Sequence, residues 1–132
     1  MPIETTRSGS KPVVIDSSGW LEYITADTKA GLFARYFESD ADILVPALVL
    51  YEVRKILLVR QSKTLADVFV SEALRKKIVP IDERIALDAA VISIQHHLPM
   101  ADALLYACAQ QHAAQFVTSD AHFRGLPGVA IL

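Results

Sequence analysis

Two aspartates in this 132-residue sequence follow short runs that we expect to form β-strands. Asp16 comes directly after the β-branched run Val13–Ile15, and Asp120 comes shortly after the run Gln115–Thr118. In parallel α/β sheets, ligands bind in the crevice beyond the carboxyl ends of the strands. Asp16 and Asp120 are therefore candidates for one site, although an aspartate after a strand also serves as a turn residue or a helix cap.

Two further acids stand in apolar surroundings. Glu52 lies between Tyr51 and Val53 in the middle of an expected helix, where a capping role is not available. Asp102 lies in the apolar segment 99–105 at the start of another helix, where the backbone dipoles favour a carboxylate. Burying a carboxylate is costly unless it is paired or bound to a metal ion. Glu52 and Asp102 therefore join the two strand-end aspartates as candidates.

Four carboxylates that converge would repel one another, and a hard divalent cation removes that repulsion. Mg²⁺ and Mn²⁺ prefer oxygen ligands, and Mg²⁺ usually keeps several waters beside one or two carboxylates and a substrate phosphate. Such a centre activates a water and stabilises charge on the phosphate in an in-line displacement. The acids therefore indicate a Mg²⁺ or Mn²⁺ site for phosphoryl chemistry.

The sequence lacks the residues that other chemistries need. Cys108 is the single cysteine, which excludes a disulfide framework within one chain and a cysteine-built zinc site. Neither a Gly-x-Ser-x-Gly frame nor a glycine-rich phosphate loop is present. A phospho-acceptor receiver domain would need paired acids in its first loop and a late lysine, but no lysine follows Lys77.

Composition is that of one globular domain in a reducing compartment. Apolar residues make up 52% and charged residues 21%, which excludes a disordered chain. No run approaches the roughly 18 apolar residues of a membrane helix, and no signal-peptide order opens the chain, so we expect a cytoplasmic protein without a membrane contact. The polar residues 1–11 are expected to be a flexible tail, and residues 12–132 a single domain.

The net charge and its distribution do not by themselves indicate a nucleic-acid partner. Thirteen Lys and Arg stand against fifteen Asp and Glu, for a formal net charge of −2, and no basic tract occurs. Without the four candidate ligands, however, basic residues exceed acidic ones by two. The basic residues that could hold an RNA backbone are Arg54, Lys55, Arg60, Lys63 and Arg124.

Short β-type runs alternate with longer helix-type stretches, which predicts an α/β domain with a mainly parallel sheet. Strands are expected at 13–15, 43–45, 78–79, 115–118 and 129–132. Ser17 or Ser18 is expected to cap the first helix. A second helix is expected at about 28–39, with Leu32, Phe33 and Tyr36 on one face. The remaining helices are expected at about 48–60, 66–77, 82–97 and 99–112.

Four motifs occur in order along the chain. The segments that carry them are Val13–Ser18 with Trp20–Tyr23, Val45–Ala47 with Glu52–Val53, Leu98–Leu104, and Phe116–Asp120 with His122–Phe123 and Gly125–Gly128. Any one motif is weak, but four in this order and spacing are a specific signal. With them the sequence resembles a known family, the PIN domain of the VapC toxin type, over about residues 12–132.

The resemblance implies a three-layer α/β/α fold with a central sheet of four to five strands. It implies an endoribonuclease dependent on Mg²⁺ or Mn²⁺ that hydrolyses phosphodiester bonds of tRNA, rRNA or mRNA with a metal-activated water. It also implies a toxin that is typically a homodimer and is inhibited by a VapB-type antitoxin. Residues near Trp20 and Leu57 are candidates for an apolar groove that takes an antitoxin helix.

The resemblance also implies roles for individual side chains. Asp16, Glu52, Asp102 and Asp120 would be the catalytic acids and the metal ligands, with Asp16 and Asp102 the most direct. Ser17 and Thr118 would supply supporting hydroxyls to the ligands or to the scissile phosphate.

One position departs from the pattern of this family. Many relatives carry a further acid two residues after the fourth acid, where this chain has His122. Three interpretations stay open: a second metal ion that binds weakly or only with substrate, a phosphate contact by protonated His122, and an exposed loop histidine. The departure also keeps a second functional class open, a PIN-like domain that binds protein or RNA without cutting it.

Overall fold

The computed structural model describes residues 11–132, so residues 1–10 of the expected tail lie outside it. Five strands form one sheet in the order β3-β2-β1-β4-β5, and every neighbouring pair is parallel. The strands are β1 (Val13–Ile15), β2 (Ile43–Pro46), β3 (Lys77–Val79), β4 (Gln115–Thr118) and β5 (Val129–Ile131). The expected parallel sheet, with its edge strand, is confirmed.

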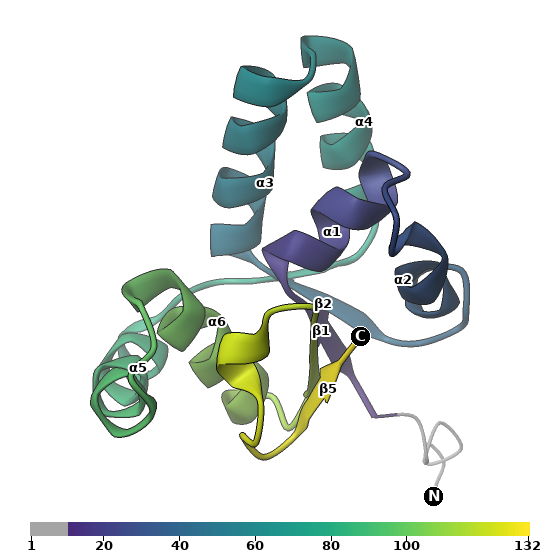
Figure 1. The fold of residues 1–132 in the computed structure, drawn as a ribbon. Helices are drawn as coiled ribbons and strands as arrows, with labels where there is room; N and C mark the ends of the chain where they lie inside the picture. The colour runs from purple at the N-terminus through teal and green to yellow at the C-terminus, as the bar shows by residue number, and fades with distance from the viewer. Residues whose placement is uncertain (1–10) are drawn as a thin grey trace, which may run out of the picture.

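Helices cover both faces of this sheet. Those that connect β1, β2 and β3 are α1 (Ser17–Ile24), α2 (Ala30–Phe37), α3 (Ala47–Arg60) and α4 (Lys63–Ala73). The return to β4 runs through α5 (Glu83–His96) and α6 (Met100–Gln111). Because parallel crossovers are right-handed, the two sets lie on opposite faces, and α3 with α4 projects from the sheet as an arm (Figure 1). The expected three-layer α/β/α fold is confirmed.

The strands are buried because they are apolar on both faces. Val14, Ile15, Val45 and Val117 have no exposed surface, as expected for a sheet covered by helices on each side. Within residues 11–132, no helix is both long and apolar enough to cross a lipid bilayer.

The topology indicates where on the sheet a ligand would bind, namely at the carboxyl ends of β1 and β4. The strand order reverses between β1 and β4, since the chain moves from β1 towards β3 and then returns to the other side of β1. Ligand crevices in open α/β sheets lie at such a point, beyond the carboxyl ends of the strands. Helix α6 leads directly into the start of β4, so its first turn lies at this same edge.

Three sequence predictions about helices are wrong in detail. The cap of α1 is Asp16, whose side chain accepts a hydrogen bond from the Ser17 N–H, instead of a serine. Helix α2 buries Phe33 and Phe37 and leaves Leu32 exposed, because Phe37 packs on the indole of Trp20 with ring centroids 4.5 Å apart.

The third difference concerns α4. This helix begins at Lys63 and ends at Ala73, earlier than expected, because Ser62 Oγ caps its first turn by accepting from the Leu65 N–H. Lys77, expected at the basic end of this helix, instead starts β3 and pairs with Leu44.

Helix α1 sits close to its neighbours because Gly19 has no side chain. A Cβ at this position would lie 2.5 Å from Phe33 Cε1 and 2.6 Å from Ile15 Cγ2. Both neighbours are fully buried and cannot move aside. Gly19 therefore allows α1, whose N-cap is Asp16, to contact both β1 and α2.

We expect Gly19→Ala to lower the free energy of unfolding by about 1–3 kcal/mol, because overpacking of a filled core costs about that much. Gly31→Ala is the matched control, since Gly31 lies in α2 with open space around its Cα. Alanine there should raise stability by about 0.5–1 kcal/mol through helix propensity. Urea unfolding of both variants measures the difference, and equal destabilisation by the two would contradict the packing argument.

Candidate metal centre

The four candidate acids come from separate elements that meet at the carboxyl edge of the sheet. Asp16 follows β1, and Asp120 follows β4, the strand beside it. Glu52 lies in the second turn of α3, which starts at the end of β2. Asp102 lies in the first turn of α6.

Asp16 is the most buried of these acids, with 6% of its surface exposed, and hydrogen bonds hold both carboxylate oxygens. The Ser17 N–H donates to Oδ1 at 2.7 Å, and Thr118 Oγ1 donates to Oδ2 at 2.7 Å. The Ser18 hydroxyl donates more weakly to Oδ2, at 3.3 Å. Burial is the largest influence on the Asp16 pKa and raises it to about 6, against the lowering effect of the Thr118 hydrogen bond. Charge repulsion from Asp102 is a smaller contribution to this raised value.

Hydroxyl groups link the acids to one another. Thr118 Oγ1, which donates to Asp16, accepts from the Asp120 N–H at 2.9 Å. Ser17 Oγ donates to Glu52 Oε1 at 2.7 Å. Ser17 and Thr118 thus orient candidate ligands. Ser18, named from the sequence as a helix cap, instead contacts the Asp16 carboxylate, a role that its place as the second of two hydroxyl residues directly after Asp16 could have suggested.

Asp102 occupies the electrostatic centre of the group. Its pKa is raised first by burial, then by repulsion from Asp120 and Glu52, while His122 lowers it. Ligand atoms of Asp102, Asp120 and His122 all lie within 4.8 Å of one another. Asp16 and Glu52 lie outside this compact group and connect to it through the charge and hydroxyl interactions above.

The donor set suits a divalent cation. Within residues 11–132, no lysine or arginine lies within 4.0 Å of the carboxylates of Asp16, Glu52, Asp102 or Asp120. His122 Nδ1, 3.0 Å from Asp120 Oδ1, is the single basic group in such contact among the described residues. Carboxylates that repel one another and lack a lysine or arginine partner fit a bound cation, and their oxygens suit Mg²⁺ or Mn²⁺.

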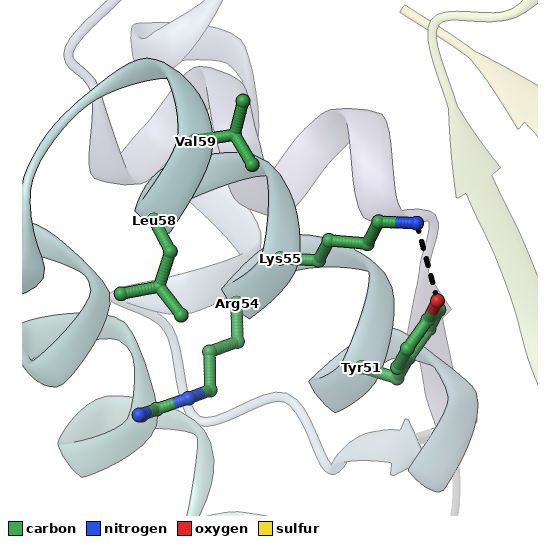
Figure 2. A pocket seen from close by; sticks show the side chains of 5 residues that line it. All are labelled: Tyr51, Arg54, Lys55, Leu58 and Val59. Atoms are coloured by element: carbon green, nitrogen blue, oxygen red, sulfur yellow. Dashed lines mark hydrogen bonds between the residues drawn. The ribbon is translucent and has the colours of Figure 1, made fainter.

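Basic and aromatic side chains line a surface pocket of about 310 Å³ on α3, the helix that carries Glu52. Figure 2 shows Lys55 extending towards Tyr51, with Lys55 Nζ 3.2 Å from the tyrosine hydroxyl. Arg54, Leu58 and Val59 complete the lining. Arg54 and Lys55 were expected from the sequence, but Tyr51 was not, although its spacing of four residues from Lys55 places both on one helix face.

The chain belongs to the PIN domain family, because the family model for the PIN domain matches residues 13–129. The resemblance found in the sequence implied both this fold and these acidic residues. No curated protein matches the chain.

Solved structures share the fold at low sequence identity. A toxin–antitoxin complex from Klebsiella pneumoniae aligns with a TM-score of 0.76 at 18% identity, over 89% of this chain and 95% of that chain. VapC20 from Mycobacterium tuberculosis, described as a sarcin–ricin loop cleaving toxin, aligns with a TM-score of 0.70 at 18% identity, over 81% and 87%. DNA-bound VapBC from Salmonella typhimurium aligns with a TM-score of 0.74 at 14% identity, over 92% of this chain and 97% of that chain.

In EDTA, we expect Asp16→Asn to raise the free energy of unfolding at pH 7 by about 1–3 kcal/mol. The folded chain holds the Asp16 pKa at about 6, above the value of about 4 in an unfolded chain. The stability contributed by the protonated side chain is therefore complete below pH 4 and is lost as the pH rises through 6. Asparagine stays neutral, so the variant avoids this loss. Urea unfolding at pH 4 and pH 7 measures it.

Asp40→Asn is the control for net charge, because Asp40 lies exposed in the turn before β2. A gain for Asp16→Asn that is no larger at pH 7 than at pH 4 would show that burial of the charged form is not what limits stability at this site.

Proposed function

We propose that this chain is a VapC-type toxin: an endoribonuclease dependent on Mg²⁺ or Mn²⁺ and inhibited by a VapB-type antitoxin. The observation that carries the proposal is the charge repulsion that links Asp102 to Asp16, Glu52 and Asp120 at the carboxyl edge of a PIN fold. No lysine or arginine in residues 11–132 is paired with these acids. The descriptions of the similar structures as toxins and VapBC complexes support the class.

The side chains divide into ligands and groups that position them. Asp16, Asp102 and Asp120 would hold the cation, with Glu52 completing the site. Thr118 and Ser17 fix the rotamers of Asp16 and Glu52 through hydrogen bonds of 2.7 Å. When bound, the ion supplies positive charge for the phosphate and makes water a competent nucleophile at neutral pH.

In the hydrolysis, water would attack phosphorus and lose a proton while the bond to the leaving oxygen breaks, and the leaving oxygen would take up one proton in exchange. No covalent intermediate is expected, because the metal-activated water is the nucleophile, while the hydroxyls of Ser17 and Thr118 serve as donors to Glu52 and Asp16. Cys108 is buried in α6, and burial raises its pKa to about 11, so it stays an unreactive thiol.

RNA is supported as the substrate by the side chains on α3. Lys55 is exposed and can neutralise a backbone phosphate, and Tyr51, with 60% of its surface exposed, offers a ring on which a base can stack. Arg54 has less positive charge available for a phosphate, because its Nη1 lies 3.7 Å from Asp67 Oδ1. This local arrangement lets a chain of net charge −2 bind a polyanion.

Exposed apolar side chains support protein partners. Trp20 and Leu57, expected near an antitoxin groove, are themselves buried in the core. Beside them on the α3–α4 arm, however, Val59 and Val68 are 76% and 46% exposed. We assign this arm to the antitoxin.

A second exposed stripe on α5 supports the homodimer. It consists of Leu87, Val91 and Ile94, with Ile94 77% exposed, and these residues are spaced along one helix face. Both partners, and a reducing cytoplasmic location, belong to this proposal.

Purified, antitoxin-free protein should cleave a pool of total tRNA and rRNA into discrete fragments when Mg²⁺ or Mn²⁺ is added. EDTA should abolish cleavage, and Asp102→Ala should lower its rate by about 100-fold or more, because a metal ligand is lost. Gel analysis of the fragments measures both effects.

Asp88→Ala is the matched control, since it removes an exposed acid from α5, outside the site. Cleavage that persists in EDTA would contradict the metal mechanism. Intact RNA under every condition, from folded wild-type protein, would favour instead a non-catalytic PIN-like domain that binds protein or RNA.

Lys55→Gln should weaken RNA binding and reduce the slope of log affinity against log salt by about 0.7–0.9, the effect of one lost phosphate contact. Fluorescence anisotropy with labelled tRNA, in the Asp102→Ala background where cleavage is slowed, measures the slope. Lys77→Gln is the control, because Lys77 lies exposed at the opposite, amino end of the sheet. Equal slopes for the two variants would remove Lys55 from the RNA interface.

A further inference from the structure

His122 is held in place by the short 3-10 helix η2 (Ala121–Phe123) that follows β4. Asp120 caps this turn, and its Oδ1 accepts from the His122 N–H at 2.9 Å. Phe123, the next residue, is fully buried and packs against Phe116 of β4 with ring centroids 4.7 Å apart. The backbone at His122 is therefore anchored from both sides, while its side chain stays 72% exposed.

The imidazole lies among the candidate ligands. His122 Nδ1 is 3.0 Å from Asp120 Oδ1, and donor atoms of His122, Asp120 and Asp102 lie within 4.8 Å of one another. Ligands about 2.1 Å from one ion can be at most about 4.2 Å apart, so a small side-chain rotation brings all three donors into range. The exposed His122 side chain can make this rotation at little cost.

A nitrogen donor changes which ion the centre prefers. Mg²⁺ is a hard ion that takes oxygen ligands and gives up its waters reluctantly. Transition-metal ions also accept imidazole, and Mn²⁺ suits carboxylates as well. Two carboxylates with one imidazole therefore match Mn²⁺ on all three donors and Mg²⁺ on only two.

We propose that His122 is a direct metal ligand, together with Asp102 and Asp120, and that its imidazole makes this centre select Mn²⁺ over Mg²⁺. The inference rests on the metal centre of the proposed function but is independent of RNA cleavage. It assigns a specific role to the histidine that stands where many relatives carry an acid.

The test uses the full chain with Mn²⁺ or Mg²⁺ alone, without RNA. Pulsed EPR of the Mn²⁺-loaded protein should detect coupling to a ligating imidazole nitrogen, and His122→Asp should abolish that coupling while Mn²⁺ still binds. Calorimetric titration should show that the ratio of Mg²⁺ to Mn²⁺ dissociation constants falls by about tenfold or more in this variant, because the third donor becomes an oxygen.

His96→Gln is the matched control, because it removes an exposed imidazole at the end of α5. It should retain both the nitrogen coupling and the wild-type ratio. Bound Mn²⁺ without nitrogen coupling, or an unchanged ratio in His122→Asp, would overturn the role of His122 and leave the nuclease proposal standing. Failure of the wild-type protein to bind either ion would overturn the metal centre as a whole.

Discussion

Asp16, Glu52, Asp102 and Asp120 gather negative charge at one edge of the sheet, and no lysine or arginine in residues 11–132 pairs with them. Their mutual repulsion is visible in Asp102, whose pKa is raised by burial and by two acidic neighbours. Hydroxyl donors offset part of this cost, but they cannot supply positive charge. A cation bound at this edge would therefore offset the remaining repulsion between the carboxylates.

Such a cluster needs a rigid support, because a mobile one would let the carboxylates move apart. Two neighbouring parallel strands, β1 and β4, provide it, and both are buried by helices on each face. Gly19 lets α1 contact β1 and α2 closely, so the first turn after Asp16 is fixed by the core. The hydrogen bond from Thr118 to Asp16 then ties the two strand ends together. Packing in the core thus determines the geometry of the site in this chain.

The groups around the acids extend the same electrostatic argument. A chain with a net charge of −2 has little general attraction for a polyanion, so the proposed RNA contact depends on local positive charge. Lys55 and Tyr51 on α3 combine charge and an aromatic face on the helix that carries Glu52. On the other side, His122 supplies a nitrogen donor beside two carboxylates, which distinguishes this centre from one built of oxygen alone.

The sequence alone determined the parallel α/β architecture, because its strands are wholly apolar runs separated by helical stretches. It also pointed to the four acids, since an acid after a buried strand or inside an apolar helix needs a reason to be there. Tertiary structure alone decided the partners: Thr118 reaches Asp16 across 102 residues, and Ser17 reaches Glu52 across 35. It likewise placed His122 beside two carboxylates. Residue spacing encodes which face of an element a side chain occupies, whereas these contacts depend on how separate elements pack in space.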